Sequence, residues 1–330
     1  MQAFETELIG KRQSLADIIA NIETETTPYT SMVQKRTRPV NQPHSWQAEV
    51  YPDSPHTGVE DGKDVETFDT VPRFLLQCYS QKFWRNPAVS DFADEAEIAG
   101  AGGGEMARQK AIAMIILKRK LEARFLSASD TALTGKTYET RGQFSWITAT
   151  AQTTFPVPAD VRTPAAQIYT GTLANYDETQ FGNMCASSYI QRKGPMEMDA
   201  FLGIYLKKKF TDFTSWQENR TNYTAVRQFN RTGDATTFTN TIDFLKTDTG
   251  SYRLHPSSFL RKTASTGADS AGTHLSGLVL DLNMCALAYT RLPRLLPQEN
   301  KGGGPRCICD AIALQMNDNP LGMMKMQIDS

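Results

Sequence analysis

Residues 100–125, GAGGGEMARQKAIAMIILKRKLEARF, place four glycines within five positions and then run directly into a long helical pattern. The pattern predicts a helix over about residues 104–128, roughly 35 Å long at 1.5 Å per residue. Glu105 lies in its first turn and basic residues fill its last turns, an order that suits the helix dipole. One broad apolar face is therefore predicted along the helix. Its stripe comprises Met106, Ala113, Ile116, Lys120 and Ala123, with Ile112, Ile115, Arg119 and Leu126 beside it.

A glycine-rich loop before a helix is also the usual setting of a phosphate-binding site. The dinucleotide fingerprint G-x-G-x-x-G fails here, because a match that starts at Gly100 needs its last glycine where Glu105 stands. The preceding stretch DFADEAEIAG is acidic and helix-like, and its carboxylates would repel a pyrophosphate. We therefore predict a conformational hinge that releases the long helix from the segment before it. The predicted hinge residues are Gly102, Gly103 and Gly104.

The other chemical motifs also fail on inspection. Residues 135–137, Gly-Lys-Thr, match the end of a phosphate loop, but Asp130 stands where that loop requires a glycine. The four histidines form no HExxH pair, and the sequence has no G-x-S-x-G elbow. Cys307 and Cys309 share one face of a predicted strand, yet they have no second pair and no nearby histidine to complete a zinc site. We therefore expect no catalytic residue, no cofactor, no metal and no enzymatic activity.

The composition is that of a folded chain with balanced charge. The 330 residues are 40% hydrophobic and 22% charged, which allows a core and two or three lobes. Lysine and arginine number 35 against 36 acidic residues, and the net charge of −1 argues against a dedicated nucleic-acid binder. No apolar run approaches the roughly 20 residues that span a bilayer. Five scattered cysteines and the lack of a secretory signal favour a reducing cytoplasm.

The N-terminal residues predict a helix and then an arm. Residues 5–23 carry apolar residues at helical spacing, and Pro28 is expected to end this helix. The stretch SMVQKRTRPVNQP that follows is basic and extended. It is either a solvated strand or a contact with a polyanion or an acidic neighbour through Lys35, Arg36 and Arg38.

A long hairpin is predicted next. Residues 45–51 alternate apolar and polar side chains, residues 71–84 form a second and longer strand, and a polar tip separates them. A hairpin of this kind has little to bury by itself, so it needs a partner surface in the same chain or in another. A short helix over 91–99 and the glycine hinge complete this region.

The remaining chain mixes helices and strands without a repeat at solenoid periods. The expected elements, in chain order, are strand and turn over 142–158, a helix over 175–194, a buried strand and a helical turn over 199–213, a surface loop or decorated hairpin over 212–241, two strands over 241–256, a strand pair over 274–297 and two short apolar segments over 307–329.

Several stretches, taken in chain order, carry a resemblance to a known family. They are IGKRQSLADIIANIETETTPYTSMVQKR with HSWQAEVY, AIAMIILKRKLEARFL, PMEMDAFLGIYLKKKFTDF, and GLVLDLNMCALAYTRLPRLLPQENKGGGPRCICDAIALQMNDNPLGMM. With these stretches the sequence resembles the major capsid proteins of tailed phages, which have the Hong Kong 97-type fold. Together the stretches cover most of the chain, and the specificity comes from their order.

The resemblance implies an α+β fold with the domain plan of those capsid proteins. Residues 1–43 would form the N-terminal helix and arm, and 44–86 the extended hairpin, or E-loop, that lies over a neighbouring subunit. Residues 87–140 would form the P-domain, with the spine helix over about 104–128. Residues 141–245 would form a mixed α/β A-domain, and 246–330 would be strands that return to the P- and A-domains.

The resemblance also implies a function. Many copies would assemble as pentamers and hexamers into an icosahedral or elongated shell around the double-stranded DNA of a tailed phage, with procapsid maturation and without contact to a membrane. Assembly would occur in the host cytoplasm, and portal, scaffolding and decoration proteins are candidate partners. The alternatives are an encapsulin-like bacterial shell and a cytoplasmic enzyme without a recognisable motif. Contacts between subunits are expected at Trp46, Val50, Phe74, Leu76 and Trp84, residues that plain strand packing explains equally well.

Overall fold

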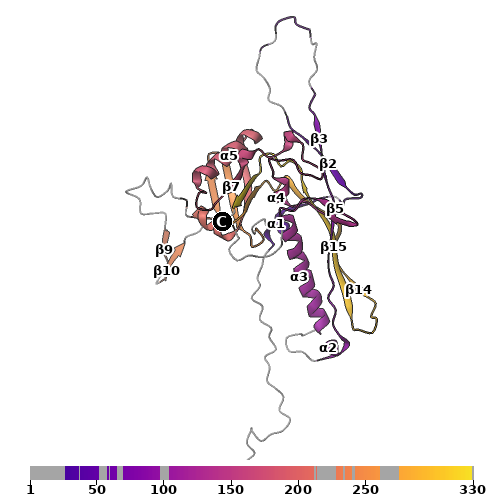
Figure 1. Ribbon diagram of the computed structural model, residues 1–330. Coiled ribbons are helices and arrows are strands. Elements are labelled where there is room, and N and C mark those ends of the chain that lie inside the picture. The colour runs from indigo at the N-terminus through magenta and orange to yellow at the C-terminus, as the bar shows by residue number, and fades with distance from the viewer. Residues whose placement is uncertain are drawn as a thin grey trace, which may run out of the picture. The chain divides into compact units, whose positions relative to one another are not determined.

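The computed structural model has a mixed α+β fold (Figure 1). The described residues are 27–36, 38–51, 58, 60–64, 70–96, 104–211, 213, 228–232, 235–239, 242–260 and 275–328. Their contacts divide into two compact units. The first unit takes its described residues from 84–117 and 293–310, and the second takes them from 26–83, 118–292 and 311–330.

The long helix predicted from the sequence is present as α3, Glu105–Phe125. The predicted apolar stripe is confirmed at Met106 and Ala113, which are buried, and is wrong at Lys120 and Ala123, which are exposed. Apolar side chains surround most of this helix, so the sequence alone does not determine which line of them faces the core. The buried line consists of Met106, Ala113, Leu117, Leu121 and Phe125.

The base of the predicted hairpin is a two-stranded antiparallel sheet. Strands β2, His44–Glu49, and β3, Arg73–Cys78, pair with Trp46 opposite Leu76. The alternation of β2 matches the sequence expectation, with Ala48 buried between exposed polar neighbours. The hairpin is thus confirmed at its base.

The single strand expected over 71–84 is wrong. The ladder ends after Cys78, and the next strand, β4 (Gln81–Arg85), joins a different sheet. The break has a direct cause. The Tyr79 N–H donates to Thr131 Oγ1 (3.2 Å) and the Ser80 N–H donates to Gln42 Oε1 (2.9 Å), so neither backbone donor is available to a neighbouring strand.

A six-stranded mixed sheet in the second unit has the strand order β11-β12-β8-β13-β16-β7. The expected strand and helical turn over 199–213 are confirmed as β8 and α6, and the expected strand pair over 241–256 is confirmed as β11 and β12. The strands are β7 (Ile168–Gly171), β8 (Met196–Leu202), β11 (Phe244–Thr247), β12 (Gly250–Pro256), β13 (Gly277–Leu280) and β16 (Met324–Ile328).

Helices α5, Glu178–Arg192, and α6, Ile204–Thr211, pack on this sheet through aromatic rings. Phe181 of α5 lies 5.0 Å from Phe210 of α6 and 5.4 Å from Tyr252 of β12, between ring centroids. A Cβ at Gly277 would lie 2.6 Å from Leu206 Cδ2, so any larger residue would force the side chains between α6 and the sheet to shift. The helix predicted over 175–194 is confirmed as α5.

A four-stranded sheet has the order β1-β14-β15-β4. Its first three strands are β1 (Gln34–Arg36), β14 (Cys285–Gln298) and β15 (Arg306–Asn317), and β1 runs parallel to β14. The strand pair expected over 274–297 is wrong, because β13 and β14 belong to different sheets. A turn at Asp281 separates them, in which the Asp281 carboxylate accepts the Asn283 N–H at 3.0 Å.

One further correction concerns a short segment. The strand expected after residue 142 is instead the helix α4, Gln143–Trp146. Pro28 begins helix α1, because proline fits the first helical turn, and the helix that it was expected to end lies outside the described residues. The remaining elements are α1 (Pro28–Met32), α2 (Asp91–Glu95), β5 (Ala132–Thr134), β6 (Thr137–Glu139), two 3-10 turns (Ala159–Val161 and Ala165–Gln167), β9 (Gln228–Thr232) and β10 (Ala235–Thr239).

Some expectations fall outside the described residues. They are the helix over 5–23 and the hinge residues Gly102 and Gly103. Among the described helices, none combines the length and the apolar character needed to span a bilayer.

Candidate functional site

The base of the hairpin is the first candidate site, because an apolar cluster fixes it to the body of the second unit. Trp46 of β2 donates its indole N–H to the Asn317 carbonyl at 3.0 Å, and its ring lies 5.5 Å from that of Trp146. Leu76 is only 1% exposed. The cluster joins β2 and β3 to α4, β14 and β15 through Ala48, Leu76, Cys78, Trp146, Val157, Val161, Ala286, Ala288, Leu314 and Met316, with Trp46, Val50 and Phe74 against it.

The five predicted contact residues therefore have two different surroundings. Trp46, Val50, Phe74 and Leu76 pack inside this chain. Trp84 on β4 is 55% exposed. On β3, Leu75 points away from the cluster and is 53% exposed. The apolar side chain that faces outward from the hairpin base is therefore Leu75, whereas the predicted contact residues on either side of it, Phe74 and Leu76, pack inside the chain.

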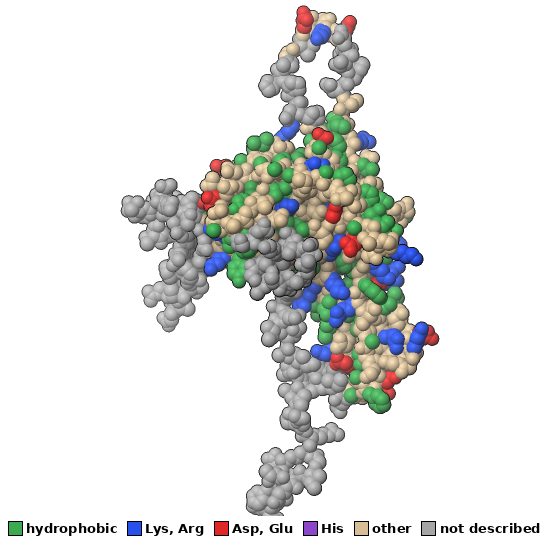
Figure 2. Space-filling view, viewed as in Figure 1, with side chains coloured by type: hydrophobic (Ala, Val, Ile, Leu, Met, Phe, Trp, Pro, Cys, Tyr) green, Lys and Arg blue, Asp and Glu red, His purple; other side chains and the backbone are tan. Residues whose placement is uncertain are grey.

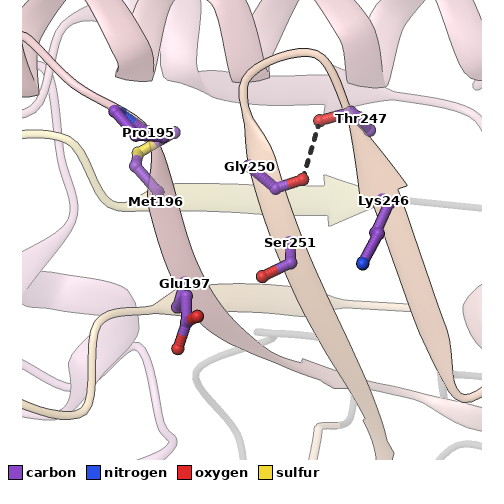
Figure 3. A pocket seen from close by; sticks show the side chains of 7 residues that line it. All are labelled: Pro195, Met196, Glu197, Lys246, Thr247, Gly250 and Ser251. Atoms are coloured by element: carbon purple, nitrogen blue, oxygen red, sulfur yellow. Dashed lines mark hydrogen bonds between the residues drawn. The ribbon is translucent and has the colours of Figure 1, made fainter.

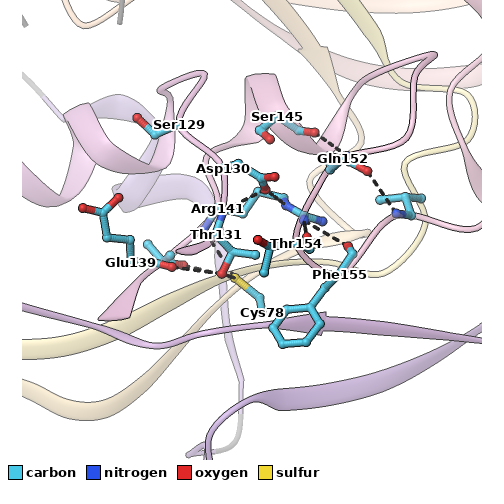
Figure 4. Close-up of polar contacts among 12 residues, drawn as sticks. Cys78, Ser129, Asp130, Thr131, Glu139, Arg141, Ser145, Gln152, Thr154 and Phe155 are labelled. Carbon is cyan, nitrogen blue, oxygen red and sulfur yellow. Dashed lines mark hydrogen bonds and ion pairs between the residues drawn. The ribbon is translucent and has the colours of Figure 1, made fainter. Parts of the chain in front are cut away.

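Arg141 is at the centre of a group of polar contacts next to the hairpin base (Figure 4). Its side chain is fully buried, its Nε donates to Asp130 Oδ1 at 2.6 Å, and its Nη2 donates to the Thr154 and Phe155 carbonyls at 2.5 and 3.0 Å. The guanidinium carbon lies 4.5 Å above the Trp146 ring. These partners compensate the buried cation at Nε and Nη2, while Nη1 is buried without a hydrogen-bond partner, so the loss of a further partner would be costly. Arg141 thus ties residues 154–155 to the start of the β5–β6 hairpin.

Phe155 has a left-handed backbone with φ of 47°, an arrangement that costs about 1 kcal/mol or more outside glycine. Its carbonyl faces the Arg141 guanidinium, which offsets that cost. Neighbouring Cys78 places its Sγ near two hydroxyls, 3.7 Å from Thr131 Oγ1 and 3.5 Å from Thr140 Oγ1, and accepts the Arg141 N–H at 3.3 Å. The sulfur therefore acts as a polar contact of the core.

The five cysteines are all free and buried. Burial raises the pKa of Cys185 to about 11 and raises that of Cys285 further, so both thiols stay protonated near neutral pH. In the part of the chain that the structure describes, no three His, Cys, Asp or Glu side chains are grouped to hold a metal ion.

The arm after residue 26 is fixed by a buried carboxylate. Glu122 of α3 is 0% exposed and accepts the Tyr29 N–H at 2.8 Å and the Thr30 N–H at 2.7 Å, so it caps the start of α1 from more than ninety residues away. Burial raises the pKa of Glu122, and the two backbone donors partly offset this. A glutamate on the apolar side of α3, between Leu121 and Phe125, was the sequence signal for this contact.

The three predicted basic arm residues differ in their contacts and in their exposure. Arg36 forms an ion pair with Asp318, in which Nη1 lies 2.7 Å from Oδ1. Burial raises the pKa of Asp318 and Arg36 opposes that rise. Lys35 and Arg38 are exposed, and Lys35 lies on β1 opposite Leu287 of β14.

The described end of the glycine segment lies in the first unit. Gly104 has φ of +87°, a conformation that side chains other than glycine adopt at a cost. The Asp94 carboxylate accepts the Met106 N–H at 3.2 Å and so caps α3, while Ser90 caps α2 by accepting the Ala93 N–H at 3.4 Å. Gly104 thus lies directly before the capped start of α3.

A shallow cavity of about 450 Å³ lies at the β11–β12 turn (Figure 3). Its walls carry one acidic and one basic side chain, Glu197 and Lys246, and Thr247 Oγ1 donates to the Gly250 carbonyl at 3.4 Å. In this lining Ser251 of β12 lies opposite Glu197 of β8. It consists of Pro195, Met196, Glu197, Lys246, Thr247, Gly250 and Ser251.

Comparisons with known proteins match this chain to capsid proteins. A family model described as SU10 major capsid protein matches residues 2–302. A structure from Mycobacterium phage Bobi has a TM-score of 0.60 at 9% identity and covers 100% of both chains. The capsid of a native GTA particle has a TM-score of 0.61 at 9% identity, with 99% of this chain and 98% of that chain covered.

A third similar structure is the capsid of Cyanophage Pam1, with a TM-score of 0.57 at 13% identity over 99% of this chain and 98% of that chain. At these identities the likeness shows the shared fold. No curated protein matches the chain.

Proposed function

Because this chain belongs to the SU10 major capsid protein family and forms the shell of a virion, we propose that the shell encloses the double-stranded DNA of a tailed phage. The match over residues 2–302 is the observation that carries the proposal. The role of such a protein is structural. A hairpin packed at its base, with exposed apolar side chains such as Leu75, supports assembly through neighbouring copies.

The Hong Kong 97-type domain plan is part of the proposal. We assign 1–43 to the arm, 44–86 to the E-loop, 87–140 to the P-domain with α3 as its spine helix, 141–245 to the A-domain and 246–330 to returning strands. The boundary at 245 falls inside β11, so the whole β11–β12 hairpin is better kept with β8 and the A-domain.

The partners follow from the same proposal. Many copies of the chain form pentamers and hexamers, and portal, scaffolding and decoration proteins complete the particle. Trp84 and Leu75 are the exposed candidates for contacts between copies. Lys35 and Arg38 are the exposed arm cations for DNA or for an acidic neighbour, whereas Arg36 already pairs with Asp318.

Light scattering combined with negative-stain microscopy of the expressed chain tests the proposal. Hollow megadalton particles or capsomer rings are the expected result, whereas a stable monomer or dimer under all conditions would refute it. The neighbouring genes separate a phage shell from an encapsulin-like compartment, since portal and terminase genes indicate the first and a cargo enzyme the second.

A further inference from the structure

Phe92 is the most exposed large hydrophobic side chain among the described residues, at 91%. It lies on α2, where Ser90 caps the helix and Ala93 packs against Val89, Met106 and Cys307. The helix is therefore held by one side while Phe92 projects from another. Figure 2 shows hydrophobic and acidic side chains exposed together in this region. A phenyl ring that a packed helix holds in solvent gains free energy when a partner surface buries it.

A second apolar surface lies on the β5–β6 hairpin of the other unit. Leu133 and Tyr138 are cross-strand neighbours and are 46% and 39% exposed. The Tyr79 ring lies 5.3 Å from that of Tyr138 and 5.0 Å from that of Phe155, so four side chains form one continuous platform. We call Tyr79, Leu133, Tyr138 and Phe155 the aromatic platform.

Hydrogen bonds hold the backbone of two platform residues in place before any partner binds. The Tyr79 N–H is bound to Thr131, and the Phe155 carbonyl is bound to the buried Arg141 guanidinium. Preorganised apolar surfaces lose little conformational entropy on association. Aromatic residues also dominate the energetic centres of protein interfaces.

The two surfaces are complementary in charge. Asp91 and Glu95 of α2 are exposed on either side of Phe92, and α2 has no basic residue. Lys136 is exposed in the turn of the β5–β6 hairpin. The acidic groups nearest the platform are already paired, Glu139 with Arg124 and Asp130 with Arg141. An acidic helix that carries a phenyl ring therefore fits a platform edged by a lysine.

We propose that Phe92 of one copy packs on the aromatic platform of a second copy, with Glu95 beside Lys136. The inference rests on the proposed function. It specifies a heterologous contact, in which two different surfaces of the same chain meet, and such contacts close into rings or shells. Phe92, Leu133 and Tyr138 are exposed in the single chain and Tyr79 and Phe155 are partly exposed, so these side chains are open to a contact that is completed on assembly.

Cysteine cross-linking gives the direct test. Particles of the double variant Phe92→Cys with Leu133→Cys, oxidised with a copper–phenanthroline complex, should give a ladder of covalent oligomers. Each single variant should stay monomeric, and a mixture of the two single variants should give dimers only. Dimers from Phe92→Cys alone, or no cross-link in well-formed particles, would overturn the proposal.

Assembly yields provide the second measurement. Phe92→Ala should lower the yield of particles at matched concentration by about tenfold or more, as expected for an interface hot spot. Ile190→Ala, which removes another exposed apolar side chain (69% exposed), serves as the control and should assemble normally. Lys136→Glu should impair assembly, and adding Glu95→Lys should restore it. Unchanged yield for Phe92→Ala, or no rescue by the charge swap, contradicts the contact.

The shell function and the contact between Phe92 and the aromatic platform can be refuted separately. If the wild-type chain forms no particles, the proposed function fails. If wild-type and Phe92→Ala chains form particles equally well, only the contact fails. If Phe92→Ala particles form but no longer bind another virion protein, Phe92 serves that protein instead, and the contact between copies is refuted.

Discussion

Lys325 is a buried lysine whose charge opposes folding. It lies on β16, is 8% exposed, and donates from Nζ to the Phe144 carbonyl at 3.1 Å. Burial lowers its pKa from 10.5 to about 8. Because the unfolded chain holds this proton more tightly, the cost of burial is fully present below pH 8 and disappears as the pH rises toward 10.5.

The size of the effect follows from the shift. A difference between pKa values of 10.5 and about 8 corresponds to about 3 kcal/mol at 1.36 kcal/mol per unit. Lys325→Met keeps the volume of the stem and removes the charge, but it leaves the Phe144 carbonyl without this donor, at a cost of about 1 kcal/mol. We therefore expect the variant to be more stable than wild type by about 2 kcal/mol at pH 7.

Urea unfolding of the unassembled chain at pH 7 and at pH 10, followed by tryptophan fluorescence, measures the difference. The advantage of Lys325→Met should shrink by more than half at pH 10. Lys118→Met, at an exposed position of α3, is the matched control and should change stability by no more than about 0.5 kcal/mol at either pH. An equal gain at both pH values, or a loss at pH 7, would refute the reasoning.

Three further changes test other contacts. Arg141→Leu should destabilise the chain by about 3–5 kcal/mol in urea unfolding, because it strands Asp130 and two carbonyls; a loss below 1 kcal/mol would contradict its central role. Glu122→Ala should cost about 1–3 kcal/mol and speed proteolysis near Tyr29, since two backbone N–H groups lose their acceptor, and an unchanged cleavage rate would count against the cap. Replacing Gly102, Gly103 and Gly104 with alanine should permit folding but impair particle formation seen by microscopy, and normal particles would count against the hinge.

The elements best predicted from the sequence are those with local signals. The helices α3 and α5 and the strands of the β11–β12 hairpin follow from periodicity, caps and a turn sequence, all of which lie within a few residues of one another. Errors arose where distant residues decide the outcome. The strand over 71–84 breaks because side chains at Gln42 and Thr131 capture its backbone donors, and no local pattern encodes that.

The candidate site shows the same difference between local signals, which can be read from the sequence, and contacts with distant residues, which cannot. The residues of the hairpin base were predicted as important, but alternation along a strand cannot say whether Leu76 meets its own chain or a neighbour. Arg141 was not singled out, because an arginine between a threonine and a glycine has no motif, and its burial depends on carbonyls 13 and 14 residues further on. A glutamate on the apolar side of α3 signals that Glu122 needs a partner, but the partners lie in another part of the chain and no local pattern identifies them.

The break at Tyr79 and Ser80 has a mechanical consequence for a shell. Strand β3 ends in the hairpin sheet, and two residues later the chain enters the sheet that contains β14 and β15. When a neighbour pulls on the hairpin, tension along β3 reaches this joint first. The force then acts on two hydrogen bonds to side chains and on the apolar cluster around Trp46. It does not break the backbone hydrogen bonds of a continuous ladder one pair after another. The base of the hairpin is thus anchored by side-chain packing, independently of the hydrogen-bond ladder of the sheet behind it.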